Sequence, residues 1–455
     1  MHPRQSVGLA AILVAGCQSY EPAPVDLQQH ARQFAERVPD GAEVRAFAEL
    51  LHHRDAQLEP FDLTDGIDLR EVRLVALLFN ADLRNARQRA GIAAASAEYA
   101  GLWDDPELSG SFERILENVA HPWIAGGAVG ITLPITGRRG LERALAESRH
   151  AEALVEARLA EAHVLESLDA TWVLWSAGRL SQALVEELVQ RLADLEAIAG
   201  RLAAAQLITA TEARAFALAR VARQADLVQA RAAVAAAELE LKQLMGLPPD
   251  RPLQLQPSVQ VAARIVDAAQ RRARLADGPA VAVARQGHAV AEHQLELAIR
   301  KQWPELTLLP GFREEDAQPR ATLGFSLPIP LWNANAREIA ESRAARDSAA
   351  ELLRGSLERA TSQLALAEAR LHAATEQRAV VDTQLLPLAE QQIADARRLA
   401  DLGRLDTLLI LDAITRSYEA KAAAIAVALA EARATIELNA LYWPELTSAD
   451  PEAAR

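Results

Sequence analysis

Two kinds of hydrophobic pattern divide this chain. Between residues 320 and 327 polar and apolar residues alternate: Arg320, Thr322, Gly324 and Ser326 on one side, Ala321, Leu323, Phe325 and Leu327 on the other. Strict alternation predicts a strand with one apolar face. The second pattern is helical and runs from Arg139 to about Ala205, a stretch that contains no proline. This stretch predicts a helix of roughly 100 Å, far longer than a globular domain requires.

The long helical stretch carries the spacing of a coiled-coil seam. Leu165, Leu168, Trp172 and Trp175 recur at steps of three, four and three residues. Such spacing predicts a helix that packs lengthwise against a neighbouring helix. Trp172 and Trp175 are therefore interpreted as seam residues and not as a ligand site.

The whole arrangement occurs twice. Leu133-Pro134-Ile135 recurs as Leu327-Pro328-Ile329, 194 residues later, and Pro106-Glu107-Leu108 recurs as Pro304-Glu305-Leu306, 198 residues later. In both places an alternating segment ends at prolines, which cannot donate to a strand ladder, and a long helical pattern follows. The chain is interpreted as a tandem duplication with the order helix, strand, strand, very long helix, turn and long helix in each unit.

Strands are predicted at about 106–115, 123–135, 304–315 and 319–330. Their dyad pattern fits strands of a membrane barrel, and equally a soluble hairpin packed on one face. The chain has no uninterrupted run of about 20 apolar residues beside them, so a membrane crossing would have to use strands. Four strands cannot close a barrel, and open edges do not persist in lipid. A barrel would therefore require several chains.

The N-terminus resembles a lipoprotein export signal. Residues 1–16 hold a basic head and a short apolar run, and Ala15-Gly16 directly precede Cys17, the only cysteine. This predicts a cleaved signal peptide and lipidation of Cys17. The alternative is an ordinary secretory peptide with a chance cysteine.

Charge and motifs exclude several classes of function. The net charge of −14 offers no basic stripe for phosphates, which argues against a nucleic-acid partner. The sequence contains no P-loop, dinucleotide-binding fingerprint, paired-cysteine metal motif or HExxH. We therefore expect neither an enzyme nor a cofactor.

The motifs in combination resemble those of the TolC-type outer membrane efflux proteins. The resemblance rests on four features: the lipobox (the small residues Ala15-Gly16 before Cys17), the strands that contain Pro-Glu-Leu, and the segments SLPIPLWNANAREIAES and GRLDTLLILDA. It implies a mainly α fold with a small transmembrane β part. Each of three chains would add four strands to a twelve-stranded barrel, and long coiled-coil helices would form a periplasmic tunnel.

Domain limits follow from the same resemblance. They are a signal peptide (1–16), an N-terminal periplasmic segment (17–65), a first repeat (66–250), a connecting equatorial segment (251–275), a second repeat (276–446) and a C-terminal tail (447–455).

The resemblance also implies site residues at the tunnel tip, where the long helices turn back. The turn residues Leu207, Ile208, Thr209, Gly403 and Leu405 are expected to contact an adaptor, and Asp412, Asp406 and Arg404 to line a constriction. Asp412 matches the later of the family's two acidic ring positions, whereas the earlier one falls on Leu409. The alternative is that Asp412 pairs within the bundle. Thr209 and Glu212 have the spacing of a helix capping box.

The expected function is an outer membrane channel in a Gram-negative bacterium. It would be a lipid-anchored homotrimer, with Leu323, Phe325 and Leu327 facing outer membrane lipid. Its partners would be a periplasmic adaptor and an inner-membrane pump of the RND type, and its cargo metal ions or small toxic compounds. The alternatives are a type I protein secretion channel and, in another class, a periplasmic adaptor or structural coiled-coil lipoprotein.

Overall fold

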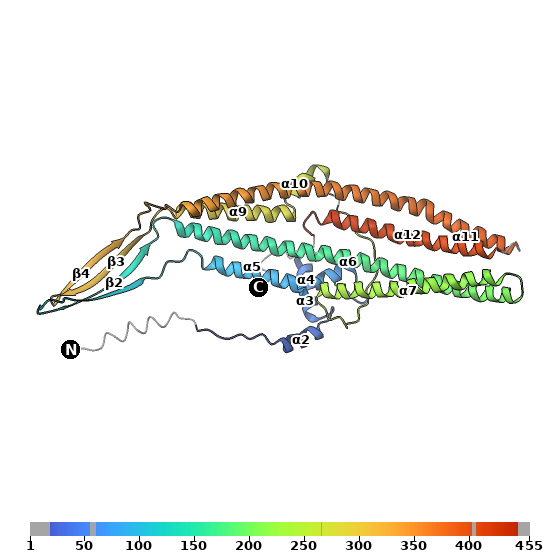
Figure 1. Cartoon of the computed structure of the whole chain (residues 1–455), viewed down its shortest axis with the longest axis horizontal. Coiled ribbons are helices and arrows are strands. Elements are labelled where there is room, and N and C mark those ends of the chain that lie inside the picture. The colour runs from blue at the N-terminus through green and yellow to red at the C-terminus, as the bar shows by residue number, and fades with distance from the viewer. Residues whose placement is uncertain (1–18, 55–60, 265, 403–405, 445–455) are drawn as a thin grey trace.

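The computed structural model of the chain is an elongated ribbon of helices with a small sheet at one end (Figure 1). It describes residues 19–54, 61–264, 266–402 and 406–444. The described helices are α2 (Leu27–Glu36), α3 (Ala42–Arg54), α4 (Leu69–Phe79), α5 (Ala81–Glu98), α6 (Arg138–Ala204), α7 (Ala210–Met245), α8 (Ala268–Ala276), α9 (Pro279–Arg300), α10 (Ala336–Val380), the π-helix η1 (Val381–Leu385), α11 (Leu386–Asp401) and α12 (Thr407–Asn439). The strands are β1 (Glu107–Arg114), β2 (Trp123–Leu133), β3 (Leu306–Glu315) and β4 (Gln318–Ser326).

The sheet is antiparallel, with the strand order β1-β2-β3-β4. Each strand is connected to a helix at one end, which we call its base: α5 precedes β1, α6 follows β2, α9 precedes β3 and α10 follows β4. In the half near the strands α9 packs between α6 and α10, and in the other half α12 takes that place. The ribbon is therefore four elements wide, with α5, α7 and β1 along one edge and α10, α11 and β4 along the other.

The predicted long helix is confirmed, since α6 has 67 residues and starts one residue before Arg139. The predicted strand limits are too wide. β4 ends at Ser326 and not at 330, and β2 ends at Leu133 and not at 135. Pro328, Pro330 and Pro134 have no N–H to donate, so the ladder stops before them.

The register gives the sheet one apolar and one polar face, because directly opposed residues share a face. Leu308 of β3 lies opposite Phe325 of β4 and opposite Ile131 of β2. On the other face the Thr132 and Thr307 hydroxyls are 3.0 Å apart, and Arg313 Nη2 lies 3.2 Å from Glu113 Oε2. The predicted faces are confirmed, and the exceptions are Ile124 of β2 and Leu309 of β3, which lie on the polar face.

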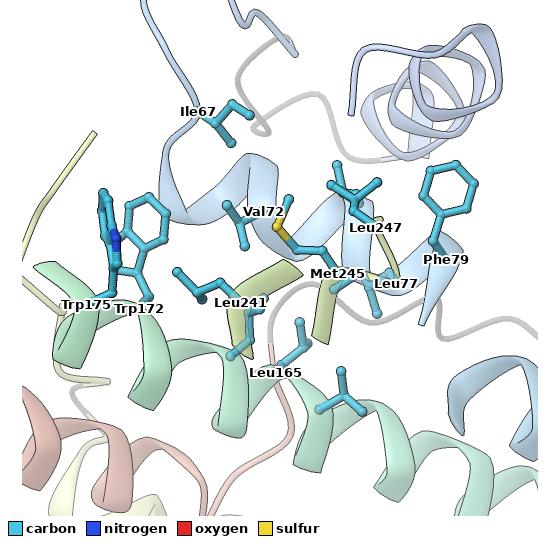
Figure 2. Packing of buried hydrophobic residues seen from close by; sticks show 14 of the residues in the cluster. Ile67, Val72, Leu77, Phe79, Leu165, Trp172, Trp175, Leu241, Met245 and Leu247 are labelled. Atoms are coloured by element: carbon cyan, nitrogen blue, oxygen red, sulfur yellow. The ribbon is translucent and has the colours of Figure 1, made fainter. Parts of the chain in front are cut away.

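The main hydrophobic core lies midway along the ribbon, where α4 packs on α6 and α7 (Figure 2). Trp172 and Leu168 of α6 and Leu241 and Met245 of α7 are almost completely buried there. Arg87 of α5 lies 2.7 Å from Glu161 of α6, an ion pair that ties α5 to the same core. Trp172 and Trp175 are thus confirmed as packing residues, with ring centroids 5.4 Å apart.

The second half differs from the first by an interruption that the sequence analysis did not predict. A π-helical turn, η1, separates α10 from α11. Pro387 lies in the first turn of α11, where a missing N–H is tolerated best. The wide turn before Pro387 accommodates the proline ring without breaking the rod.

Candidate functional site

The two helical turns at the end of the ribbon opposite the strands form the first candidate site. In the first turn Gln206 has a φ of 59°, a left-handed conformation that usually favours glycine. Leu207 is 72% exposed, and Ile208 is half-buried. Thr209 caps α7: its N–H donates to Glu212 Oε2 (2.7 Å), and the Glu212 N–H donates to Thr209 Oγ1 (3.1 Å). The predicted capping box is confirmed.

The second turn is described only in part. Gly403, Arg404 and Leu405 lie outside the described residues, so their predicted roles remain predictions. Asp406 caps α12, with its carboxylate accepting from the N–H groups of Leu408 (3.0 Å) and Leu409 (3.1 Å). This carboxylate is therefore already engaged by backbone donors.

The two turns lie near one another. Hydrogen bonds from the Thr209 N–H and hydroxyl lower the pKa of Glu212, and the negative charge of Asp406 opposes this shift. The starts of α7 and α12 both lie at the end of the ribbon opposite the strands (Figure 1). The ribbon therefore presents carboxylates from both repeats at one end.

Asp412 lies on the exposed surface of α12, one and a half turns from the start of the helix. Its Oδ2 accepts from Arg416 Nε at 2.8 Å and from Gln392 Nε2 of α11 at 3.2 Å. The ion pair raises the pKa of Arg416. Within one chain, Asp412 thus has the in-bundle partners that the alternative interpretation expected, while nearly half of its side chain stays exposed.

A cavity of about 390 Å³ separates the two hairpins close to this end. It lies between α6 and the pair α11–α12, and Leu195, Ile393 and Ile410 form apolar parts of its lining. The sequence analysis did not predict it, because it depends on how two coiled coils from different repeats lie against each other.

The apolar face of the sheet forms the second candidate site. Leu323, Phe325 and Leu327, predicted to face lipid, are 77%, 75% and 44% exposed. On the outer strand β1, Leu108 and Phe112 are 79% and 84% exposed on the same face. Such a large contiguous apolar surface requires a covering partner or lipid.

The sequence analysis did not single out a set of exposed tryptophans. Trp103, Trp303 and Trp332 stand at strand–helix junctions and are 64%, 66% and 96% exposed, and Trp123 begins β2 at the far end of the sheet. The sequence signal that could have identified these tryptophans is their position directly outside the alternating segments.

Cys17, the predicted lipidation site, lies outside the described residues. Within the described ranges, helices that are long and apolar enough to span a bilayer are absent. The same part of the chain brings no three histidine, cysteine or acidic side chains together in a way that could hold a metal ion.

Comparison with known proteins gives a match in structure only. No protein-family model matches the chain, and no curated protein sequence does. Among solved structures, the outer membrane protein VceC of Vibrio cholerae is 17% identical with a TM-score of 0.69, covering 87% of this chain and 98% of VceC. The CmeC outer membrane channel of Campylobacter jejuni is 14% identical with a TM-score of 0.70, covering 86% and 89%.

The open state of the MtrE outer membrane channel of Neisseria gonorrhoeae is 15% identical with a TM-score of 0.67, covering 82% of this chain and 88% of MtrE. These matches span nearly the full length of each known channel. The chain therefore has the fold of the TolC-type outer membrane channels, and the predicted mainly α fold with a small antiparallel sheet is confirmed, whereas the twelve-stranded barrel of three chains stays a prediction.

Proposed function

We propose that the protein is the outer membrane channel of a tripartite efflux system, giving pumped metal ions or small toxic compounds passive exit from the periplasm. One observation carries the proposal: a sheet with an exposed apolar face and a polar face continues directly into helices of tunnel length. A conduit needs both parts, whereas an enzyme needs a pocket with converging catalytic groups. The structural likeness to CmeC and MtrE supports the same conclusion.

The sheet supports a trimeric barrel. β1 and β4 are open edges in a single chain, and a bilayer does not tolerate unpaired ladder groups. Pairing β4 of one copy with β1 of the next closes a twelve-stranded barrel from three copies. The Arg313–Glu113 pair and the Thr132–Thr307 pair would then line the lumen, and Phe325 would face lipid.

The helical edges support the same assembly. On α7 a complete seam at steps of three and four residues is exposed and apolar in one chain: Leu218, Val221, Ala225, Val228, Ala232, Ala235 and Leu239. It lies opposite the buried side of α7, on which Leu227, Val234 and Leu241 face α6. A heptad seam without a partner helix predicts a coiled-coil contact to another chain.

The other edge carries a matching seam on α10. Leu352, Leu366 and Val380 are 58%, 50% and 52% exposed. The series of three- and four-residue steps between them contains the small residues Gly355, Ser362, Ala369 and Ala373 and two charged residues, Arg359 and Glu376. Small residues allow two backbones to approach closely. The α7 edge of one copy can therefore pack on the α10 edge of the next, and repetition around a threefold axis closes the ring.

The seam provides a test of assembly. Val228→Glu places a charge in the predicted contact between copies and should convert trimers to monomers in mild detergent, measured by light scattering. The matched control is Ala233→Glu, which is exposed on the same helix but away from the seam. A trimer that survives Val228→Glu, or a monomeric unaltered protein, would contradict the proposed architecture.

We propose that Cys17 carries the lipid anchor. Arg37, directly after α2, lies 5.1 Å over the ring of Phe79, which ends α4 just before α5 begins. α5 has 18 residues and leads about 27 Å toward the strands. The ten residue steps between Cys17 and Leu27 span up to about 33–36 Å, and residues 19–26 lead from α2 toward the strand end (Figure 1). Cys17→Ser should abolish fatty-acid labelling and signal cleavage.

We propose that the end with the two turns is the periplasmic aperture and the docking end for an adaptor and an RND-type pump. Its carboxylates support a cation-selective, narrow opening. Asp412→Ala should weaken cation selectivity and divalent-cation block in planar-bilayer conductance. Glu351→Ala, which also removes an arginine-paired carboxylate but on α10, is the matched control. Unchanged block in Asp412→Ala would assign Asp412 to packing alone.

A further inference from the structure

The row of helices between α6 and α10 is interrupted midway along the ribbon. α9 starts there at Pro279 and α12 ends there at Asn439, so the two helices lie end to end in this row (Figure 1). The two ends are in close contact on one side, since a Cβ added to Gly278 would lie 2.7 Å from Leu441 O. The remaining space between α6 and α10 is a cavity of about 500 Å³, which we call the wall niche.

The floor of the wall niche is apolar. Leu275 of α8, Val281 of α9 and Ala360 of α10 form a buried cluster there. Leu159 of α6 and Leu366 of α10 add apolar surface to its walls. Binding sites for drug-sized molecules have volumes of about 300–1,000 Å³, whereas one water molecule takes up about 30 Å³. The wall niche therefore has the size and the surface of a site for an organic molecule.

Two pairs of polar side chains also line the wall niche. In the first pair, Glu437 of α12 accepts from Arg370 of α10 at 2.7 Å. In the second, Glu166 of α6 faces His163, whose Nδ1 is 3.6 Å from Glu166 Oε2, which is too long for a hydrogen bond. Within the described ranges no lysine or arginine forms an ion pair with Glu166. A carboxylate in this position, beside an apolar cavity, favours a ligand that carries a positive charge.

The wall niche lies on the side of α6 that continues the polar face of the sheet. Glu305, directly before β3, is two residues from Thr307 of that face. Arg138, the first residue of α6, lies 3.6 Å from Glu305 and 3.0 Å from Glu142. Residues at steps of seven stay on one side of a coiled-coil helix, and three such steps lead from Glu142 to His163. Since the polar face lines the lumen in the proposed barrel, the wall niche opens into the tunnel.

We propose that the wall niche is a cargo-binding site inside the tunnel and that its ligand is an organic cation with an apolar, aromatic body. This inference rests on the proposed function, since it requires a lumen on this side of α6, and it selects one of the two cargo classes named there. An organic cation buries its apolar body on the floor and places its charge beside Glu166, whereas a metal ion leaves the apolar floor unused. The competing occupant is α7 of the neighbouring copy, because Leu366 also belongs to the exposed seam of α10.

Two ions of equal shape and opposite charge test the assignment. Binding of tetraphenylphosphonium and of tetraphenylborate to the assembled protein in phosphatidylcholine nanodiscs is measured by equilibrium dialysis, with empty nanodiscs as the blank. The phosphonium should bind saturably and more tightly than the borate. Glu166→Gln should weaken phosphonium binding about fivefold without weakening borate binding. Glu296→Gln is the matched control and should change neither affinity, because Glu296 also lies beside a histidine, 3.9 Å from His293 Nδ1, but in the last turns of α9 near the strands.

A second variant fills the wall niche. Ala280 lines it and is exposed in a single chain, so Ala280→Trp should abolish saturable binding of the phosphonium. Phosphonium binding that survives Ala280→Trp, or that does not respond to Glu166→Gln, would place the ligand elsewhere and overturn the inference. Displacement of the phosphonium by an equal concentration of Ni²⁺ would overturn the choice of an organic cation.

Planar-bilayer conductance separates this inference from the proposed function. If the protein conducts but does not bind the phosphonium saturably, the neighbouring copy fills the wall niche or the niche takes no such ligand, and only this inference is overturned. If the protein forms no conducting channel, the proposed function fails, and the inference that rests on it fails as well.

Discussion

The two helical hairpins, built from corresponding parts of the two repeats, are stabilised differently. Large side chains are buried in the first hairpin, α6–α7: Val164, Leu168, Trp172, Leu188 and Leu192 from α6, and Phe216, Leu227, Val234 and Leu241 from α7. Alanine dominates in the second: Ala360, Ala367, Ala374, Ala389 and Ala396 from α10 and α11, and Ala413, Ala420 and Ala434 from α12.

This difference separates a stiff part from an adaptable one. Full burial of a Leu or Phe side chain contributes about 1.5–3 kcal/mol, whereas one methyl-sized group contributes about 0.8 kcal/mol. The first hairpin is further held by the core around α4. The second allows closer backbone approach but gains less from each buried position, so it is the hairpin whose packing can rearrange at lower cost.

The π-turn belongs to the adaptable hairpin. Buried apolar positions recur every seven residues at Ala360, Ala367 and Ala374 of α10 and at Val381, the first residue of η1, but the next is Ala389 of α11, eight residues on. A π-helical turn holds one extra residue, so η1 absorbs this additional residue and keeps Ala389 in the seam. The first repeat has no corresponding interruption within α6.

Trp172→Ala should give the largest effect, and this effect should be centred on the first hairpin. Truncation of a fully buried tryptophan costs about 3–5 kcal/mol. Hydrogen exchange of α6 and α7 near the core should accelerate strongly, and so should that of α12 around Ala432 and Ile436, which belong to the same core. The helices α10 and α11 serve as the internal control. Equal acceleration in both hairpins would mean that they unfold as one unit and that the contrast between them is wrong.

Ala374→Leu should push the second hairpin apart. The alanine methyl group is buried in a close contact, and overpacking costs about 1–3 kcal/mol. Faster exchange of α12 amides is the expected result. Thr375→Leu, one residue along and exposed, is the matched control. If Ala374→Leu does not accelerate the exchange of α12 amides, the prediction is wrong. The packing around residue 374 would then be looser than the burial of Ala374 indicates.

Removal of the extra residue should convert the segment α10–η1–α11 into one uninterrupted α-helix, as α6 is. Deleting Thr383 and replacing Pro387 with Ala restores a seven-residue step and supplies the missing N–H. Because the change adds one backbone hydrogen bond, the expected gain is small, about 1 kcal/mol. Exchange around residues 380–390 should slow to the level of α10. Unchanged exchange there would show that η1 does not weaken the rod.

The smallest effect should be a pH response at the turn of the first hairpin. Hydrogen bonds from Thr209 hold the pKa of Glu212 below its ordinary value. Their stabilisation is therefore complete above the ordinary glutamate pKa of about 4.3 and is lost as the pH falls through the lowered pKa. Exchange at residues 207–213, corrected for intrinsic rates, should accelerate in that acid range. Glu212→Gln should remove the pH dependence, and a variant that keeps it would assign the response to another group.

The sequence by itself determined the elements and their order. Alternation over eight residues and the three-four spacing around Trp172 depend only on the chain's own periodicity, and prolines end a strand wherever they stand. The Thr209–Glu212 capping box is equally local, because its partners are three residues apart.

Only the tertiary structure decided what depends on contacts between distant segments. The pairing of β2 with β3 joins residues more than 170 positions apart. The partners of Asp412, the cavity between the hairpins and the exposed seam of α7 all follow from how α6, α7, α11 and α12 lie together. The π-turn has the same origin: it is required only because Ala374 and Ala389 must meet one seam, and that seam exists only once α12 is in place.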